Sequence, residues 1–248
     1  MKTGLFLVGL LAVALAEVIQ LSPQQEEEAR LALRNPDLYD GDMAGINGPL
    51  DAERNAIVGD AYRWPNAVVP YVVDDSLSQI DAQEPINKAI ADYHANTCVR
   101  FVKRTNENNY IKLFYGKGCY SNVGKINGEQ EVSLGAGCWY TGTVVHELGH
   151  ALGFYHEQSR SDRDDYLVIY LENVTQGQEF NFMKLPSNQN ILYNDFDHNS
   201  VMIYGNKSFS KNGEDTIVAK NGQTLTDPFN KPGLAQSDIE RVNKMYNC

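Results

Sequence analysis

Short runs of β-branched and aromatic residues predict a sheet in the first half of the chain. Runs of this length, bounded by polar or turn-forming residues, are typical of strands. The candidates are residues 67–73 (AVVPYVV), 98–102 (CVRFV), 110–115 (YIKLFY) and 131–134 (EVSL). Because proline cannot donate to a strand ladder, Pro70 indicates that the first of these strands lies at an edge or a bend.

Apolar residues at helical spacing predict three helices. The first spans about residues 82–97, where apolar side chains recur at intervals of three and four. The second runs from about 142 to 152 and ends at Gly153, a residue type that commonly ends helices. The last begins at Ser237, whose spacing to Glu240 fits a capping box.

Two stretches show little regular patterning. Residues 157 to about 230 are rich in Asn, Asp, Gly and Ser, which predicts loops with only short regular elements. Residues 17–54 are acidic and polar, and their one marginal helix, in QQEEEARLALR, gives no sign of a core. We therefore predict one α+β domain, with an ordered first half and a loop-rich second half.

Composition and charge exclude several classes of protein. Hydrophobic residues make up 42% of the 248 residues, which is too many for a disordered chain. The 21 Lys and Arg against 32 Asp and Glu give a net charge of −11, which argues against wrapping nucleic acid or binding an anionic membrane surface. Glycine and proline counts of 20 and 9 are ordinary, so collagen-like and low-complexity chains are excluded.

The first sixteen residues have the pattern of a secretory signal peptide. A basic start at Lys2 is followed by an apolar run over 5–15 and by the small-x-small end Ala14-Leu15-Ala16. The alternative is a membrane anchor, but the run is shorter than the roughly 20 residues that a span needs. We expect cleavage after Ala16 and a secreted, extracellular protein. Two sequons then become candidate glycosylation sites, at Asn173 and Asn206.

Secretion changes the meaning of the four cysteines. An even number in an oxidising compartment predicts two disulfides, with three possible connectivities. Cys119 and Cys138 enclose a short, turn-rich segment, which favours local pairing and leaves Cys98 for Cys248. A zinc site built on cysteines is the rival interpretation, but the chain has no Cys-x-x-Cys pair.

The segment TVVHELGHALGFYHEQSRSDRDDY carries the candidate chemistry. On a helix, His146 and His150 project from the same face and can bind one zinc ion, while Glu147 sits where it can reach a metal-bound water. Gly153 lets the chain turn so that His156 returns as a third ligand. A bare His-Glu-x-x-His also occurs by chance on helices, but the third histidine at this spacing makes the pattern specific. Zinc is preferred, although Co²⁺ or Mn²⁺ could substitute.

These residues resemble the zinc signature of the astacin family of metzincin endopeptidases. The match covers residues 146–163 (HELGHALGFYHEQSRSDR), and residues 200–205 (SVMIYG) resemble the family's Met-turn. Ile203 stands where many members carry histidine, a position that is not a ligand. The resemblance extends from about Ala56 to the C-terminus and implies a metzincin-like zincin domain. In that fold the first half holds a twisted, mostly antiparallel-edged sheet and two helices, and the second half is loop-rich with a last helix.

The resemblance also implies roles for individual residues. Met202 would form a hydrophobic floor under the metal, and Tyr204 would be a fifth zinc ligand that moves to stabilise the oxyanion. A zinc-bound water would attack the peptide bond, with Glu147 as general base and then acid. The substrate, a protein or peptide, would lie extended along an edge strand near residues 119–121. The family's disulfides map onto Cys98–Cys248 and Cys119–Cys138.

The acidic segment resembles an astacin pro-segment. Residues 39–42 (YDGD) are similar to the Phe-x-Gly-Asp motif, in which the final aspartate, here Asp42, coordinates zinc in the zymogen. The rival interpretation is an ordinary acidic glycine turn. An activating protease would cut near Arg54, dividing a pro-segment (17–54) from a catalytic domain (55–248). The new ammonium of Asn55 would then pair with Glu157, because a buried charge needs a partner.

Two rival functions remain to be weighed. An inactive secreted binding protein would be expected to have lost Glu147 or a ligand, and all are present. A zinc hydrolase acting on a non-peptide bond has no feature here in its favour. We therefore predict a secreted, latent zinc endopeptidase, a monomer that binds neither nucleic acid nor membranes.

Overall fold

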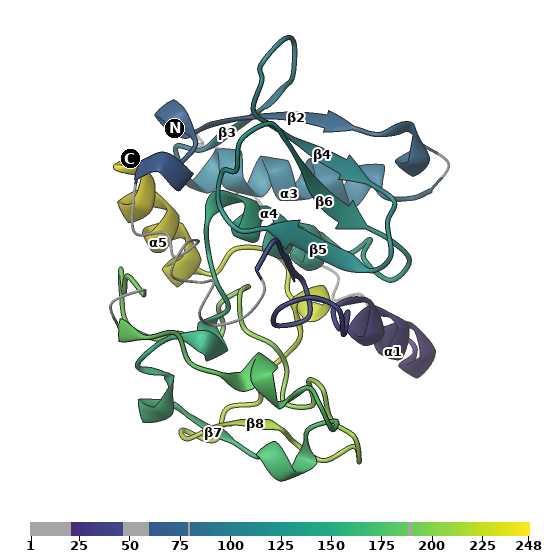
Figure 1. The fold of residues 1–248 in the computed structure, drawn as a ribbon, viewed down its shortest axis with the longest axis vertical. Helices are drawn as coiled ribbons and strands as arrows, with labels where there is room; N and C mark the ends of the chain where they lie inside the picture. Colours follow the sequence, from purple (N-terminus) through teal and green to yellow (C-terminus); the bar gives the residue numbers. More distant parts are fainter. Residues whose placement is uncertain (1–20, 47–59, 79, 188–189) are drawn as a thin grey trace, which may run out of the picture.

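The computed structural model describes residues 21–46, 60–78, 80–187 and 190–248 (Figure 1). The predicted signal peptide, residues 1–16, and the predicted cleavage site at Arg54 and Asn55 lie outside the described residues. Figure 1 shows two halves, one built on a sheet with helices and the other made mainly of loops. This division, and the α+β content, confirm the fold class expected from the pattern.

The main sheet has six strands in the described residues, in the order β1-β5-β6-β4-β2-β3. The strands are β1 (Met43–Ala44), β2 (Val68–Val73), β3 (Arg100–Lys103), β4 (Tyr110–Phe114), β5 (Cys119–Asn122) and β6 (Glu129–Leu134). Only β5 and β6 pair antiparallel, and every other neighbouring pair in this sheet is parallel. The predicted antiparallel pairing is therefore limited to β5 with β6, and β1 forms the edge of the sheet beside β5.

The expectation that Pro70 marks an edge strand was wrong. Strand β2 lies inside the sheet, between β3 and β4. Pro70 pairs only with Val102 of β3, because the pairing with β4 begins one residue later, at Tyr71. The ladder on the β4 side therefore starts after the residue that lacks an N–H group, and proline is tolerated there.

Helices α3 (Gln83–Asn96) and α4 (Thr141–Leu152) cover the sheet and contact each other. The apolar residues that predicted α3 are buried, and the hydroxyl of Tyr93 donates to the Val145 carbonyl of α4 at 2.9 Å. Every α4 residue after Thr141 is buried. The helix ends where predicted, at Gly153, whose φ of +120° suits glycine. Helix α4 is therefore fixed in the core from nearly all sides.

Helix α5 (Gln236–Tyr246) begins one residue before the predicted Ser237, and the predicted capping box with Glu240 is absent. Asp238 accepts from the backbone N–H of Ala235 at 2.9 Å, which is the half of a capping box that an N-cap alanine permits. The hydroxyl of Ser237 donates instead to Asp197, at 2.6 Å. Asp238 takes the capping position because it is buried and also binds residues 200 and 201.

The second half has short regular elements, as its composition predicts. Its sheet is a single antiparallel pair in the described residues, β7 (Leu167–Ile169) with β8 (Ile217–Ala219). A separate apolar cluster supports it, including Phe182, Phe209 and Leu225. No helix in the described part of the chain is long and apolar enough to cross a membrane.

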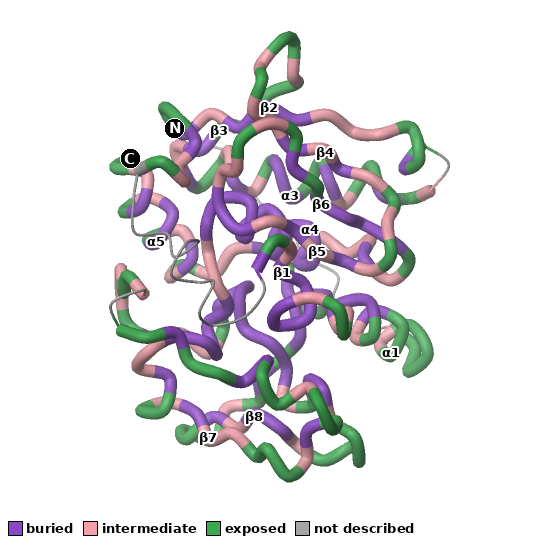
Figure 2. The backbone as a smooth tube through the Cα atoms, in the orientation of Figure 1, coloured by how far each residue is buried: buried purple, intermediate pink, exposed green. Residues whose placement is uncertain are grey.

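Residues 21–46, here called the N-terminal segment, lie between the two halves (Figure 1). Helix α1 (Pro23–Ala32) is capped by Ser22 and Gln25, and it buries Ala29 and Leu33 in the main core. Strand β1 joins the sheet at β5. Figure 2 shows that the loop between α1 and β1 is buried where it passes between the halves. The segment therefore gains its core from the rest of the chain, which its own polar sequence does not reveal.

Two disulfides close the fold, with the connectivity expected from the sequence. Cys98 joins Cys248 across 150 residues, and Cys119 joins Cys138 across 19 residues. The first bond attaches the chain after α5 to the connection between α3 and β3, and the second holds β5 near the start of α4.

Candidate metal centre

Helix α4 presents two histidines on one face, and the turn after it returns a third. His146 and His150 are four residues apart, so their side chains lie side by side on the helix. The turn at Gly153 brings His156 back toward them. Atom Nε2 of His146 lies 3.1 Å from Nε2 of His150 and 3.1 Å from Nε2 of His156. All three rings are buried.

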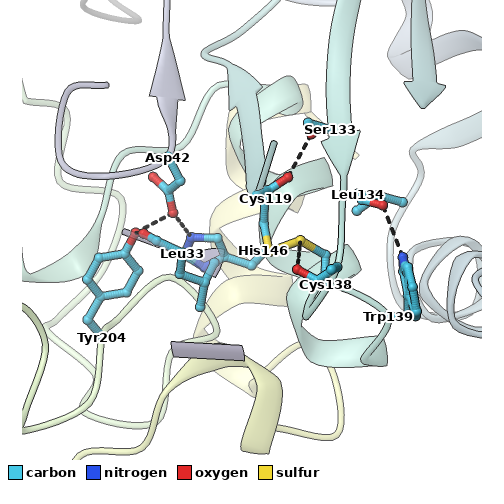
Figure 3. Close-up of a disulfide and its surroundings, with 11 residues drawn as sticks. Leu33, Asp42, Cys119, Ser133, Leu134, Cys138, Trp139, His146 and Tyr204 are labelled. Atoms are coloured by element: carbon cyan, nitrogen blue, oxygen red, sulfur yellow. Dashed lines mark hydrogen bonds and ion pairs between the residues drawn. A yellow bond between two sulfur atoms is a disulfide. The ribbon is translucent and has the colours of Figure 1, made fainter. Parts of the chain in front are cut away.

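The fourth group of the centre comes from the N-terminal segment. Asp42 Oδ2 lies 3.1 Å from His146 Nε2 and 3.2 Å from His156 Nε2, and Asp42 Oδ1 lies 3.4 Å from His150 Nε2. Figure 3 shows the Asp42 carboxylate between the ring of His146 and the phenol of Tyr204. The four candidate ligand atoms lie within 4.8 Å of one another. The structure therefore brings together the four residues that the sequence nominated as ligands.

The other ring nitrogens fix the state of the imidazoles. The oxygens nearest Nδ1 of His146, His150 and His156 are Val201 O (2.8 Å), Phe154 O (2.7 Å) and Asp40 Oδ2 (2.7 Å). Because a carbonyl oxygen or a carboxylate only accepts, each Nδ1 carries a proton and each Nε2 turns a lone pair to the centre. Two ligands of a tetrahedral zinc ion, at 2.0–2.1 Å, are about 3.3 Å apart, close to the separations found here. Three neutral imidazoles and a carboxylate therefore fit Zn²⁺.

The charges around the centre favour a cation. Burial lowers the pKa of His146 to about 3, so this imidazole is neutral, as a metal ligand must be. Burial also opposes a charge on His156, but Asp42 and Asp40 outweigh it and raise its pKa to about 10. Against its own burial, Asp42 has a pKa held well below the ordinary value by His156, His150 and His146. Surroundings that stabilise a second proton on His156 also stabilise a metal dication in its place.

Glu147 lies next to the first ligand and is fully buried. Neither carboxylate oxygen has a hydrogen-bond partner among the described residues. Burial, reinforced by the charge of Asp42, raises the pKa of Glu147 well above its ordinary value. A buried carboxyl group without protein partners, beside a metal centre, is suited to exchanging a proton with a reacting water.

Tyr204 faces the centre from the loop-rich half. Its hydroxyl makes a short hydrogen bond to Asp42 Oδ2, and Asp40 O and Leu33 O lie 3.2 and 3.3 Å from it. Its ring centroid is 4.3 Å from that of His156. Burial and then the nearby carboxylates raise the pKa of Tyr204 well above its ordinary value, so the phenol keeps its proton. It is therefore a neutral hydrogen-bond donor at the centre.

Met202 lies against α4 on the turn between the first two ligands. A Cβ atom added at Gly149 would come within 2.7 Å of Met202 Sδ, so the glycine allows the sulfur to approach the helix closely. The backbone N–H of Glu157 donates to the Met202 carbonyl at 2.9 Å. This contact places residues 200–205 beside the turn that carries His156, and it agrees with the expected floor.

Lys231 and Asp238, which the sequence did not single out, bind the backbone and the serine of the loop 200–205. The buried amine of Lys231 donates to the carbonyls of Ser200 and Ile203, both at 2.7 Å. Asp238 accepts from the Ser200 hydroxyl at 2.6 Å and from the Val201 N–H at 2.8 Å. Burial lowers the pKa of Lys231 to about 8. A lone lysine in an irregular stretch gives no sequence signal for such a role.

Glu157 is buried and already has partners. Its carboxylate forms a bidentate pair with Arg241 of α5, with both N–O distances 2.6 Å, and it accepts from Arg160 at 3.1 Å. Burial raises the pKa of Glu157, while the two arginines oppose this shift. Sequence reasoning did not single out Arg241. The predicted pairing with the ammonium of Asn55 concerns a residue outside the described ones and stays a prediction.

The other candidates have structural surroundings. His94, which belongs to no motif of the sequence, accepts at Nε2 from the backbone N–H of Phe101 at 2.9 Å and so has a structural role. The amide nitrogens of the two sequon asparagines donate to backbone carbonyls, Asn173 to Asp215 at 2.8 Å and Asn206 to Ile217 at 2.7 Å. Because a glycan would replace one of the two hydrogens on each of these nitrogens, each bond would have to be made by the remaining N–H after modification.

Comparison with known proteins agrees with this geometry. The sequence model of the peptidase family Astacin matches residues 56–247. The chain belongs to the astacin family. It is therefore a metalloprotease by family, and astacins are zinc-dependent, which matches the three histidines and the aspartate gathered here.

The share of a relative's length that this chain covers differs from one astacin to another. Astacin-like metalloprotease toxin 1 of Loxosceles intermedia is 42% identical over 85% of this chain and 81% of that protein. Blastula protease 10 of Paracentrotus lividus is 38% identical over 93% of this chain, which spans only 38% of that longer relative. Among solved structures, high choriolytic enzyme 1, a hatching enzyme zinc-protease from Oryzias latipes, has a TM-score of 0.65 at 38% identity. That match covers 75% of this chain and 93% of the hatching enzyme chain.

Proposed function

We propose that this protein is a secreted zinc endopeptidase made as a latent zymogen, in which the N-terminal segment is the pro-segment. The observation that carries the proposal is the position of Asp42, whose carboxylate lies against all three histidine Nε2 atoms. With Asp42 in place, four protein groups surround the centre, as in a closed zinc site. Catalytic zinc sites keep one position open, so removal of Asp42 would convert the first kind of site into the second.

Zinc, when bound, supplies the Lewis acidity that lowers the pKa of a water molecule and polarises the scissile carbonyl. The residue that moves protons is Glu147. It takes a proton from the attacking water and later passes it to the leaving amine. Its buried carboxyl group, which has no hydrogen-bond partner among the described residues, supports this role because it is free to bind a proton from the water.

Tyr204 would stabilise the charge that develops on the carbonyl oxygen. In the present structure its hydroxyl donates a hydrogen bond to Asp42. It therefore faces the position that the pro-segment would vacate on activation. Once Asp42 has gone, the same neutral donor is free to bind an oxyanion. Asp42 would thus block both the metal position and the oxyanion donor.

The substrate would be an extended stretch of protein or peptide that pairs with β5. Strand β1 covers this strand in the zymogen, with Met43 opposite Ser121 and Ala44 opposite Asn122. Removing the pro-segment would leave one edge of β5 without a strand partner, next to the metal centre. An extended peptide can add to such an edge through its backbone.

Secretion is supported by the leader pattern of residues 1–16 and by the two disulfides, which persist in oxidising compartments. Activation would require a protease that cuts near Arg54. The freed ammonium of Asn55 would then approach Glu157, which its two arginines keep charged and ordered. We propose that the activated enzyme is a monomer.

The catalytic assignment is tested by Glu147→Gln in the activated enzyme. We expect zinc content to stay at one ion per chain while kcat/KM falls about 10²- to 10⁴-fold, because the proton carrier is lost. Metal analysis and cleavage of a fluorogenic peptide measure the two quantities. Glu240→Gln, at an exposed position on α5, is the matched control. Parent activity in Glu147→Gln would rule out this mechanism.

Latency is tested separately by Asp42→Ala in the uncleaved proform. We expect this proform to hydrolyse the peptide without activation, because the fourth position of the centre becomes free and the Tyr204 hydroxyl keeps only the weaker contacts to Asp40 O and Leu33 O. Asp37→Ala alters an exposed aspartate of the same segment and should leave the proform silent. If the intact Asp42→Ala proform also fails to hydrolyse the peptide, Asp42 is not the group that keeps the proform inactive.

A further inference from the structure

We propose that Asp40 is a positioning residue for His156, a second pro-segment carboxylate that strengthens the hold of the centre on zinc in the proform and is lost at activation. This inference rests on the proposed zymogen function. Its role differs from that of Asp42, which lies at the metal position, because Asp40 contacts the opposite side of the His156 ring.

The contact is direct and buried. Asp40 Oδ2 lies 2.7 Å from His156 Nδ1, and the Ser159 hydroxyl donates to the same oxygen at 2.7 Å. Asp40 is 1% exposed, so this carboxylate has left water to make these bonds. Both bonds are made by Oδ2, since Oδ1 has no hydrogen-bond partner among the described residues, so the buried charge depends on His156 and Ser159.

The backbone turns sharply to make both contacts possible. Asp40 has a φ of +52° and Gly41 a φ of +90°, so two successive residues adopt left-handed conformations. A Cβ atom at Gly41 would come within 2.6 Å of the Leu33 carbonyl oxygen, which excludes any larger residue there. The turn places Asp40 at Nδ1 of His156 and Asp42 at Nε2 of the same ring, on opposite sides of one imidazole. A left-handed conformation is unfavourable for an aspartate, and the two bonds to Asp40 offset this cost.

His156 is the exception among the three ligands. His146 and His150 donate from Nδ1 to backbone carbonyls of Val201 and Phe154, which remain after the pro-segment is cut away. His156 donates to a group that leaves with the pro-segment. Cleavage therefore changes the outer partner of one ligand and leaves the other two unchanged.

The chemical consequence follows from the charge of that partner. A carboxylate at Nδ1 makes the opposite nitrogen of an imidazole a stronger donor to a metal, and its loss typically weakens metal affinity 10- to 100-fold. The proform should thus bind zinc more tightly than the activated enzyme by a contribution that is specific to Asp40. This contribution adds to that of Asp42, which contacts the centre itself.

The test compares zinc dissociation constants of proforms, measured by competition with a chromophoric chelator. All variants carry Glu147→Gln to prevent self-cleavage. Asp40→Asn keeps the side-chain shape and tolerates a left-handed backbone but removes the charge. We expect it to weaken zinc binding about 10-fold or more, with Asp37→Asn unchanged. The Co²⁺-loaded proform should also show a shifted visible absorption band in Asp40→Asn but not in Asp37→Asn, which a general loss of stability would not produce.

Cleavage after Arg54 provides an internal control. The activated forms of the parent and Asp40→Asn should bind zinc equally, because residue 40 is no longer attached. Ser159→Ala, which removes the second partner of Asp40, should weaken zinc binding in the proform alone. If the Asp40→Asn proform binds zinc as tightly as the parent, the inference is overturned. If the parent proform, with Glu147 restored, is active before cleavage, the zymogen proposal fails instead.

Discussion

Tyr204 has one hydroxyl proton and three oxygen atoms within hydrogen-bonding distance, and all three belong to the N-terminal segment. If the segment leaves as proposed, the phenol would lose all three of these partners; in the present structure its ring packs beside that of His156. A residue whose donor is committed in one state and released in another can act in catalysis only in the second. Under the proposed function, the hydrogen bond to Asp42 would therefore keep the oxyanion donor occupied in the latent state.

We predict that Tyr204→Phe in the activated enzyme lowers kcat about 10²- to 10³-fold with a much smaller change in KM, because a donor to the developing oxyanion is lost. Steady-state kinetics on a peptide substrate provides both constants. Zinc content measured in parallel is the control, since the ring itself is retained. An unchanged kcat would remove Tyr204 from the oxyanion role.

At the scale of elements, the position of α4 sets the geometry of the centre, because it carries two of the ligands and Glu147. Its first turn meets the backbone of the 3₁₀ turn Pro228–Asn230 at Gly142. A Cβ atom there would come within 2.1 Å of the Pro228 carbonyl oxygen and 2.4 Å of the Lys231 carbonyl oxygen. Neither oxygen belongs to a movable side chain, so only glycine allows the helix to lie where it does.

We predict that Gly142→Ala destabilises the proform by about 2 kcal/mol or more, in spite of the better helix propensity of alanine, since the helix must move off the turn. Gly149→Ala should cost less, because its new methyl group meets the flexible side chain of Met202. Urea denaturation of the two variants measures both free energies. Equal losses, or a gain for Gly142→Ala, would contradict this account of the contact.

The elements differ in how far the sequence predicts them. Helices α3 and α4 are predicted by the spacing of their apolar residues. Helix α3 buries one continuous face, and α4 is buried along nearly its whole length. The burial of α1 could not be foreseen, because the core that receives it belongs to residues more than a hundred positions away, such as Leu134 and Cys138. Pro70 misled for a similar reason, since its tolerance depends on where the neighbouring strand begins.

The site shows the same division. Its three histidines and Glu147 lie within eleven residues and are predicted by local spacing alone. Asp42 and Tyr204 come from distant segments and were reached only through resemblance to a family. Lys231 and Arg241 were missed because their roles exist only after tertiary folding places a buried carbonyl pair and a buried carboxylate beside them.

At the scale of the whole molecule, the two disulfides constrain very different lengths of chain. In the chain-entropy model, closing 150 residues stabilises the fold by about 5 kcal/mol and closing 19 residues by about 3 kcal/mol. The longer loop includes α4, the metal centre and the whole loop-rich half. The two bonds should therefore contribute unequally to stability.

We predict that replacing Cys98 and Cys248 by alanine destabilises the proform by about 5 kcal/mol, against about 3 kcal/mol for Cys119 and Cys138. Urea denaturation of the two double variants under oxidising conditions gives the comparison. The opposite order would show that local strain or packing around the sulfurs, and not loop length, controls their contribution.

The pairing of Glu157 with Arg241 has a consequence for the order of synthesis. The two residues are 84 positions apart, so a ribosome adding 5–20 residues per second needs roughly 4–17 s to supply the arginine after the glutamate. Until then Glu157 lacks its bidentate partner, so burying its carboxylate would be costly. Asp42, by contrast, is translated 104 positions ahead of His146. If Asp42 is the inhibitory group proposed above, the growing chain would carry it before the histidines of the centre are made.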